Sequence, residues 1–592
     1  MSRFLSSGAI FALAATSVVY HLYLIFSGLL PNLITRPLHL ALALPWVFLI
    51  GAKGNAVRRW SGYVLCAVGV AGSLWVALNR DALVDQYGSL EGPLQYAIAI
   101  ALIVTVLEMA RRRIKAALPT VAVLALLYGL FGHLIPGEFG HPGMPLGSFL
   151  GTLVIAEGGL WGQLTGISVN VVAVFVILGA FVSAGEGGPG FMLLATRLAG
   201  RMRAGPAKVS VLSSALFGSI SGSASANVAS TGSVTLPAMK KLGYPASFAA
   251  AVEAVASSGG QIMPPLMGAG AFLMVELLRI TYVDVMAAAI LPSLLFFWAT
   301  WAGVDHFAKR NGLRGLSPEE TPAWDDVMRT APFFLAPFGV LLAMLFWTGY
   351  TPQYAAALAT GVSFLLLGVD RHFTLSLKRW WTGLDKAVVD SARQIATVAA
   401  IIVCAGLVIG VLNMTGLGVK VTSVIIGASG GNLWIALGFT AIACLILGME
   451  VPTTAAYVIC VSVAGPALQE LGLPELHAHL FVFWYALLST ITPPVCGTVF
   501  IAAGMADTPW VPVANRAMRL GLGLYVVPLA FIANPALIHP EISLPLALLA
   551  MVKIGAGVWL LSGAVSGNSG TAWKPPLYFA LGAVLIFAFG LG

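Results

Sequence analysis

The sequence predicts an all-α protein that crosses a membrane many times. Of its 592 residues, 59% are hydrophobic and 9% are charged, and the mean hydropathy is +0.92. Water-soluble domains carry about 25% charged residues, so this chain has too little polar surface to cover a core in water. Apolar stretches that approach or reach the length that spans a bilayer as a helix give roughly 17 to 20 membrane segments, some of them too short to span alone. The clearest are Phe4–Leu30, Tyr63–Asn79, Leu94–Ala110, Val285–Val304, Pro332–Trp347, Asn432–Leu447 and Leu544–Leu561.

The beginning of the chain holds four of these stretches. Basic residues follow the second stretch, at Lys53, Arg58 and Arg59, and the fourth, at Arg111–Arg113 and Lys115, whereas the other two loops are poorer in them. Both ends of this first block are therefore predicted to be cytoplasmic. The net charge of +8 is explained by such topology signals, and no nucleic-acid partner is predicted.

The residue types that usually build catalytic centres form no pattern here. The five cysteines lie in apolar segments without metal-ligand spacing, and the nine histidines are scattered. The chain also has no GxxxxGK[ST] loop for the phosphates of a nucleotide. We expect no metal site built from these residues, no cofactor other than a coupling ion, and no enzyme activity.

An internal repeat organises the middle of the chain. PAMKKLGYP, from Pro237, returns 229 residues later as PALQELGLP, from Pro466. A double proline follows each copy at the same distance, at Pro264-Pro265 and at Pro493-Pro494. All of these prolines coincide when the sequence is aligned with itself at a shift of 229 residues. This coincidence predicts two structurally equivalent copies.

Charges at equivalent positions indicate how the copies are oriented. Lys240 and Lys241 in the first copy correspond to Gln469 and Glu470 in the second, so only one of the two turns has a cytoplasmic signature. This difference is typical of inverted-topology repeats in secondary transporters. Such repeats place substrate and ion sites near the middle of the membrane, at their interface.

Each copy contains a predicted re-entrant hairpin. In the first, residues 208–241 include GSISGSASANVASTGSVTLP, and two helices too short to cross the bilayer meet at a tip near Ser221–Ser223. In the second, residues 448–472 begin with GMEVPTT, where Pro452 breaks the helix and the tip lies near Val451–Thr453. Non-helical backbone at this depth is tolerated where it is buried in protein or lines a cavity.

The helix after each hairpin also ends in polar residues before its double proline. Hydroxyls and free carbonyls beside broken helices can replace the hydration shell of a small cation. Small residues that merely allow close helix packing are the alternative interpretation. The predicted ion and substrate region comprises Ser223, Ser225, Asn227, Ser257, Gly260, Thr453, Thr454, Thr490 and Thr492.

Two stretches of the first copy carry a resemblance to a known family. ALFGSISGSASANVASTGSVTLPAMKKLGY and AAAVEAVASSGGQIMPPLMGAGAF resemble the large membrane subunit of tripartite ATP-independent periplasmic (TRAP) transporters, in particular the fused TAXI-type permeases. The resemblance implies an elevator-type permease in the inner membrane of a bacterium or archaeon. It implies uptake of a small organic acid, a dicarboxylate or an amino-acid-like acid, from a periplasmic TAXI-type binding protein, coupled to Na⁺ or H⁺.

The resemblance also implies a domain organisation. Residues 1–115 would be a fused small-subunit-like domain of four membrane helices, assigned by position and span count, which serves as a scaffold. Residues 116–160 would be a connecting helix and an interfacial segment. Residues 161–535 would form the transport core, and residues 536–592 additional membrane helices.

Two carboxylates depart from the family pattern. Large subunits of the wider family typically carry uncharged residues where this chain has Glu253 and Glu450. A charge within a span costs about 2.5–3.5 kcal/mol on insertion scales and usually marks an ion pathway or a proton relay. Glu253 and Glu450 are therefore predicted to carry a proton or bind a cation; a hydrogen-bonded structural glutamate is the alternative.

Two other classes of function are weighed against transport. Polar re-entrant loops also form the selectivity filters of channels, although inverted repeats favour alternating access. Gly427–Gly430, GASG, matches the GxSG pattern of intramembrane serine proteases, which need a histidine partner at the same depth. The positions of the histidines in the sequence offer no convincing mid-span partner.

Overall fold

The computed structural model describes residues 6–50, 55–114, 116–449, 451–566, 574–588 and 590. Helices dominate this part of the chain, where the only β-pairing is an isolated bridge between Val369 and Leu375. Ten helices are long and apolar enough to cross a membrane, or eleven if the bent pair Trp324–Thr330 and Pro332–Trp347 is one span. The all-α polytopic fold is confirmed. Other apolar stretches are too short to span alone, as expected for part of the predicted segments, and are arms of hairpins or halves of broken helices.

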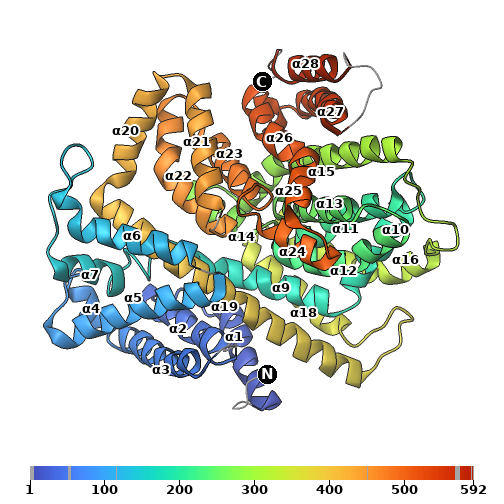
Figure 1. Cartoon of the computed structure of the whole chain (residues 1–592). Coiled ribbons are helices and arrows are strands. Elements are labelled where there is room, and N and C mark those ends of the chain that lie inside the picture. The colour runs from blue at the N-terminus through green and yellow to red at the C-terminus, as the bar shows by residue number, and fades with distance from the viewer. Residues whose placement is uncertain are drawn as a thin grey trace.

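Four membrane-length helices form the N-terminal block. They are α1 (Ser7–Phe26), α2 (Asn32–Pro45) with its π-helical continuation to Ile50, α3 (Ala56–Leu78) and α5 (Gly92–Ile114), with the short α4 (Arg80–Asp85) between the last two. Helices α1, α2 and α5 pack against the long α19 (Leu377–Thr415). Figure 1 shows the block in blue on one side of the molecule, with the red helices α27 (Leu544–Ser566) and α28 (Lys574–Phe587) on the other.

A buried chain of hydrogen bonds ties the N-terminal block to the core. The Nε2 atom of His21 lies 2.8 Å from Nδ1 of His39, and Nε2 of His39 lies 3.0 Å from the Ser168 hydroxyl. Nearby, the Arg36 guanidinium donates to the Trp161 carbonyl and pairs with Glu157 at 3.2 Å. Polar groups buried without partners would be costly, so these contacts fix how the block sits on the core.

The predicted repeat is visible in the helix bounds. With a shift of 229 residues, five pairs of helices coincide to within two residues at each end. The pairs are α10 (Gly187–Ala199) with α20 (Leu417–Ser429), α11 (Gly205–Ser221) with α21 (Leu433–Gly448), α12 (Ala224–Lys241) with α22 (Thr453–Glu470), α13 (Ala246–Gly259) with α23 (Glu475–Leu488), and α14 (Ala269–Leu278) with α24 (Gly497–Ala506).

Helices α11 and α12 form the first hairpin, and its tip is where the sequence predicts it. Gly222 ends α11 with φ of 57°, a conformation that favours glycine, and α12 begins two residues later. The tip packs against the break between α13 and α14: the Leu266 amide donates to the Ser219 carbonyl at 3.2 Å. A Cβ on Gly222 would lie 2.6 Å from the Met267 carbonyl oxygen.

The second hairpin is longer than predicted. Its first arm is α21, so the predicted interval 448–472 covers only the tip and the second arm, and the stretch Asn432–Leu447 is an arm rather than a separate span. Its tip also packs against a helix break, because a Cβ on Gly448 would lie 2.7 Å from Cβ of Ser489.

The two copies cross at their helix breaks. Helix α14, which follows the first break, packs against α22 and α23, whereas α24, which follows the second, packs against α12 and α13. The hydroxyls of Ser258 and Thr490 join the breaks at 2.9 Å. Each half-helix thus lies on the hairpin of the other copy, an arrangement that supports the predicted opposite orientation of the copies.

The remaining helices surround these units. They are α6 (Ala117–Phe131), α7 (Leu146–Val154), α8 (Gln163–Ile167) and α9 (Ala173–Ala184) before the first copy's α10, α15 (Tyr282–Asn311), α16 (Trp324–Thr330), α17 (Pro332–Trp347) and α18 (Pro352–Leu366) between the hairpins, and α25 (Trp510–Leu520) and α26 (Leu522–Ala533) after them. Helix α27 packs against α15 and α26.

Candidate functional site

Glu253 lies at the middle of α13, completely buried, and faces both arms of the first hairpin. Five hydroxyls surround its carboxylate, and with Glu253 they are called the Glu253 cluster below. On Oε2 they are Ser210 at 2.7 Å and Thr235 at 2.5 Å; on Oε1 they are Ser257 at 3.3 Å, Ser214 at 3.5 Å, and Thr231 in close contact.

The cluster offers this carboxylate no positive charge. All five partners that the structure describes are neutral hydroxyls, and each of them is itself buried. An ionised carboxylate that is removed from water without a paired charge is strongly disfavoured. Within the described residues, an ionised Glu253 would therefore have no compensating positive charge beside it.

Asn227 closes the cluster at the level of the helix break. Its Nδ2 donates to the Ser214 carbonyl at 2.8 Å and lies 3.5 Å from the Ser257 carbonyl. Two glycines make room for it: a Cβ on Gly260 would lie 2.7 Å from that Nδ2, and one on Gly218 would lie 2.3 Å from Cα of Gly260. Asn227, Ser257 and Gly260, three of the predicted site residues, are thus brought together next to Glu253.

The other predicted residues of the first copy lie apart from the cluster. The Ser223 hydroxyl caps α12 by accepting from the Ala226 amide at 3.4 Å. Ser225 is exposed. Neither side chain has a described contact with the Glu253 carboxylate, so a role in coupling remains a prediction for both.

Only part of the predicted second-copy set reaches the first copy. Thr490 contacts Ser258, the neighbour of Ser257, whereas the Thr492 hydroxyl lies 2.7 Å from the Tyr525 hydroxyl. Thr453 is buried and Thr454 half-buried at the start of α22. Glu450 lies outside the described residues.

Sequence reasoning missed Ser210, Ser214, Thr231 and Thr235. A signal for them exists, because Ser210 and Ser214 are four residues apart, as are Thr231 and Thr235, and as are Glu253 and Ser257. Residues four apart lie on one face of a helix. Three neighbouring helices each present such a polar pair, and the pairs meet in the structure.

The structure corrects one expectation about histidines. His21 and His39 are buried within membrane-length helices and His479 is buried in α23, so buried histidines do occur. Their described hydrogen-bond contacts are with one another, with the Ser17 carbonyl, with Ser168 and with Tyr457. The Ser429 hydroxyl of the GASG stretch donates to the Ile426 carbonyl at 2.9 Å. Within the residues described, no three His, Cys, Asp or Glu side chains group as a metal site.

Repeated hairpins, broken helices and a buried carboxylate define a polytopic membrane permease. Residues 101–544 match the family described as "Tripartite ATP-independent periplasmic transporter, DctM component". Because this match covers more than half of the chain, the protein belongs to that family. It is an integral protein of the inner membrane and a transporter rather than an enzyme.

Individual relatives are distant. The chain is 26% identical over 376 residues to the C4-dicarboxylate TRAP transporter large permease protein DctM of Pseudomonas aeruginosa, covering 63% of this chain and 84% of the relative. It is 25% identical over 427 residues to the ectoine/5-hydroxyectoine large permease UehC of Ruegeria pomeroyi, covering 69% and 94%. With the isethionate permease DctMQ of Oleidesulfovibrio alaskensis it shares 26% identity over 339 residues, 56% of this chain and about half (51%) of that protein.

Proposed function

We propose that the protein takes up a small organic acid, a dicarboxylate or an amino-acid-like acid, delivered by a periplasmic TAXI-type binding protein. The observation that carries this proposal is the family match over residues 101–544, together with two hairpins whose tips pack on helix breaks. The names of the relatives, which refer to C4-dicarboxylates, isethionate and ectoine, support a small organic solute. Residues 1–115 then serve as the fused small-subunit-like scaffold.

Transport is proposed to follow an elevator mechanism. The two hairpins and the two broken helices pack on one another and cross at Ser258 and Thr490, which supports their movement as one unit. The N-terminal block instead packs on α19, outside this unit, and would stay fixed in the membrane.

Proton exchange at Glu253 is the proposed coupling step. The Thr231 hydroxyl lies 2.8 Å from the Asn227 carbonyl, and the Thr235 hydroxyl lies 3.0 Å from the Thr231 carbonyl, while both also contact Glu253. A hydroxyl has one proton to donate. When Glu253 is ionised, both hydroxyls can donate to it; when it is protonated, they can donate to the carbonyls and one can accept from the acid. Both states of the carboxyl therefore find partners.

The proposal is tested with purified protein in liposomes. Uptake of radiolabelled dicarboxylate or glutamate is measured with and without a TAXI-type binding protein from the same organism, under an imposed pH gradient or Na⁺ gradient. We expect accumulation only with the binding protein, driven by the pH gradient and without ATP. Uptake driven by a Na⁺ gradient alone would show that sodium, not the proton, is the coupling ion. Non-saturating flux without the binding protein would indicate a channel.

A further inference from the structure

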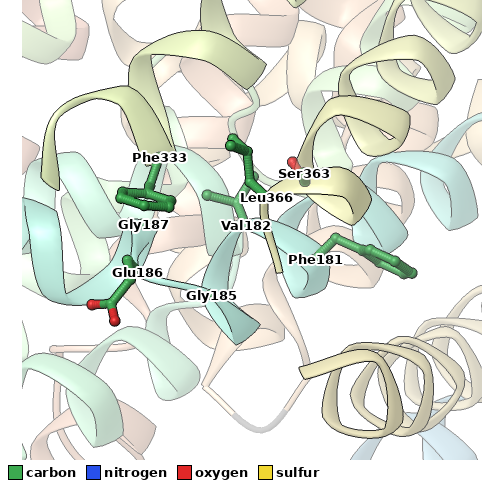
Figure 2. Close-up of a pocket in the computed structure, with 8 residues that line it drawn as sticks. All are labelled: Phe181, Val182, Gly185, Glu186, Gly187, Phe333, Ser363 and Leu366. Carbon is green, nitrogen blue, oxygen red and sulfur yellow. The ribbon is translucent and has the colours of Figure 1, made fainter. Parts of the chain in front are cut away.

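A groove of about 500 Å³ opens where three segments meet, away from the Glu253 cluster. These segments are the end of α9, the start of α10 and the first turns of α19 with the loop before them. Figure 2 shows the small pocket beside it, which shares Gly185 and Glu186 with the groove. We call the larger space the basic groove, because its charged lining side chains are Lys378, Arg379, Lys386 and Glu186.

The charges of the basic groove do not cancel. Glu186 accepts from Arg379 at 2.8 Å, which leaves the two lysines. Lys378 and Lys386 are exposed and form no ion pair within the described residues. Arg379 retains further N–H donors besides those that face Glu186. An anion with several acceptor oxygens, such as a phosphate group, matches this set of donors.

The groove lies on the cytoplasmic side of the membrane-spanning part of α19. Helix α19 has 39 residues and is roughly 58 Å long, about twice the hydrocarbon thickness. All of its charged side chains precede Gln394, so the later part is the span. Arg113, at the basic end of α5, donates to the Thr397 hydroxyl at 2.7 Å and marks the boundary between the two parts. The positive-inside rule places this boundary on the cytoplasmic side.

Exposed apolar side chains stand next to the lysines. Phe373, Leu375, Leu377 and Trp381 are between 53% and 82% exposed. Contiguous large apolar side chains are rarely left facing water, and tryptophan prefers the membrane interface. This segment therefore lies against the lipid rather than projecting into the cytoplasm.

We propose that the basic groove binds the headgroup of an anionic phospholipid from the cytoplasmic leaflet. Lys378, Lys386 and Arg379 contact the phosphate, and the acyl chains lie along Leu375 and Leu377. Because the groove includes the link from α9 to α10, and α10 packs on α11, a bound lipid would connect the membrane surface to the first hairpin.

Binding is measured with the full-length protein in detergent, with dihexanoyl phosphatidylglycerol, dihexanoyl phosphatidylcholine and inorganic phosphate as probes. For the double variant Lys378→Gln/Lys386→Gln we expect about tenfold weaker binding of the phosphatidylglycerol, because each basic residue adds to the attraction of an anionic lipid. Lys378→Arg/Lys386→Arg should restore it. The matched control Lys309→Gln/Arg310→Gln, at exposed positions at the end of α15, should bind like the wild type.

Three outcomes would overturn the proposal. One is unchanged phosphatidylglycerol binding in the double variant while the circular dichroism spectrum stays native. Another is equal binding of the zwitterionic phosphatidylcholine. The third is inorganic phosphate binding as tightly as the lipid, which would indicate a site for a free anion. The variant Leu377→Ser separates the last case, because it should weaken lipid binding and leave phosphate binding unchanged.

Discussion

At the middle of α13 the first copy carries Glu253, and at the equivalent position of α23 the second copy carries Val482. The same contrast continues around both residues. Ser257, Thr231 and Thr235 correspond to Ala486, Cys460 and Ala464, and all of these side chains are buried. Ser210 corresponds to Phe439, which is 41% exposed. Helices with equivalent bounds thus surround a polar cluster in the first copy and apolar side chains at the equivalent position in the second.

The second copy has a polar pair of its own in a different place. The Tyr457 hydroxyl lies 2.8 Å from Nδ1 of His479, and both side chains are buried. Their counterparts in the first copy are Val228 and Ala250. The repeat therefore conserves the backbone frame, while each copy places its polar groups independently. Among the residues that the structure describes, a carboxyl group next to a helix break is found in the first copy, at Glu253.

The largest effect is expected from removing the charge that distinguishes the copies. Glu253→Gln keeps the shape and several hydrogen bonds but cannot exchange a proton, so gradient-driven uptake should fall at least about tenfold, toward that of empty liposomes. Tryptophan fluorescence and gel filtration should show an unchanged fold. As a control, Ser230→Ala, at an exposed position of the same hairpin arm α12, should retain uptake within about twofold. Normal accumulation by Glu253→Gln would make Glu253 a structural residue.

Moving the charge to the second copy tests the same contrast through stability. Val482→Glu places a carboxyl among apolar side chains without the five hydroxyls, and an uncompensated buried charge costs about 3–5 kcal/mol. The unfolding midpoint in detergent should drop sharply, and the yield of folded protein should fall. Val482→Ile serves as the apolar control and should stay close to the wild type. A midpoint as high as that of the control would show that the second copy accommodates a carboxyl group.

An intermediate loss of stability is expected from filling the space at a helix break. Gly260→Ala forces a Cβ against Asn227 and Gly218, and overpacking of this kind costs about 1–3 kcal/mol. The equivalent residue of the second copy, Ser489, already has a side chain, because Gly448 leaves room for it. Ser489→Ala loses only the 2.7 Å hydrogen bond to the Ala486 carbonyl and should cost about 1 kcal/mol or less. Equal midpoints for the two variants would remove this difference between the breaks.

The smallest effect concerns the loop between α18 and α19, in the connection between the two copies. Asp370 accepts from the amides of His372 and Thr374 at 2.8 and 3.0 Å, and hydrogen bonds from Thr374 lower its pKa to about 2. Because this pKa lies below the ordinary value of 3.8, the stabilisation is complete above about pH 4 and is lost as the pH falls toward 2. Amide exchange at His372 and Thr374, corrected for intrinsic rates, should accelerate over that window. Asp370→Ala should show faster exchange at neutral pH and no such window.

The sequence predicts the first hairpin better than the second. The tip at Ser221–Ser223 was predictable because glycine and serine interrupt an apolar pattern there, and Gly222 adopts a positive φ. The arm Leu433–Gly448 is uniformly apolar, so composition does not distinguish it from a full span. Only its equivalence to α11 reveals its role.

Prediction of the site residues from the sequence has a similar limit. Glu253 and Ser257 could be grouped from the sequence because they lie on the same face of one helix. Ser210 and Ser214 come from another helix, and the sequence does not say which face of α11 turns toward α13. The exposure of Ser225 has the same origin, since the rotation of α12 about its axis is set by packing rather than by local pattern.

The hydrogen bond between His39 and Ser168 has a consequence for biogenesis. His39 enters the membrane 129 residues before its partner is synthesised, and its imidazole would otherwise face the cost of a buried polar group alone. Because one polypeptide carries both residues, the partner always arrives in equal number and at a local concentration of about millimolar, whatever the level of expression. Assembly of the N-terminal block onto the core is thereby a folding step of one chain, insensitive to dilution in the membrane.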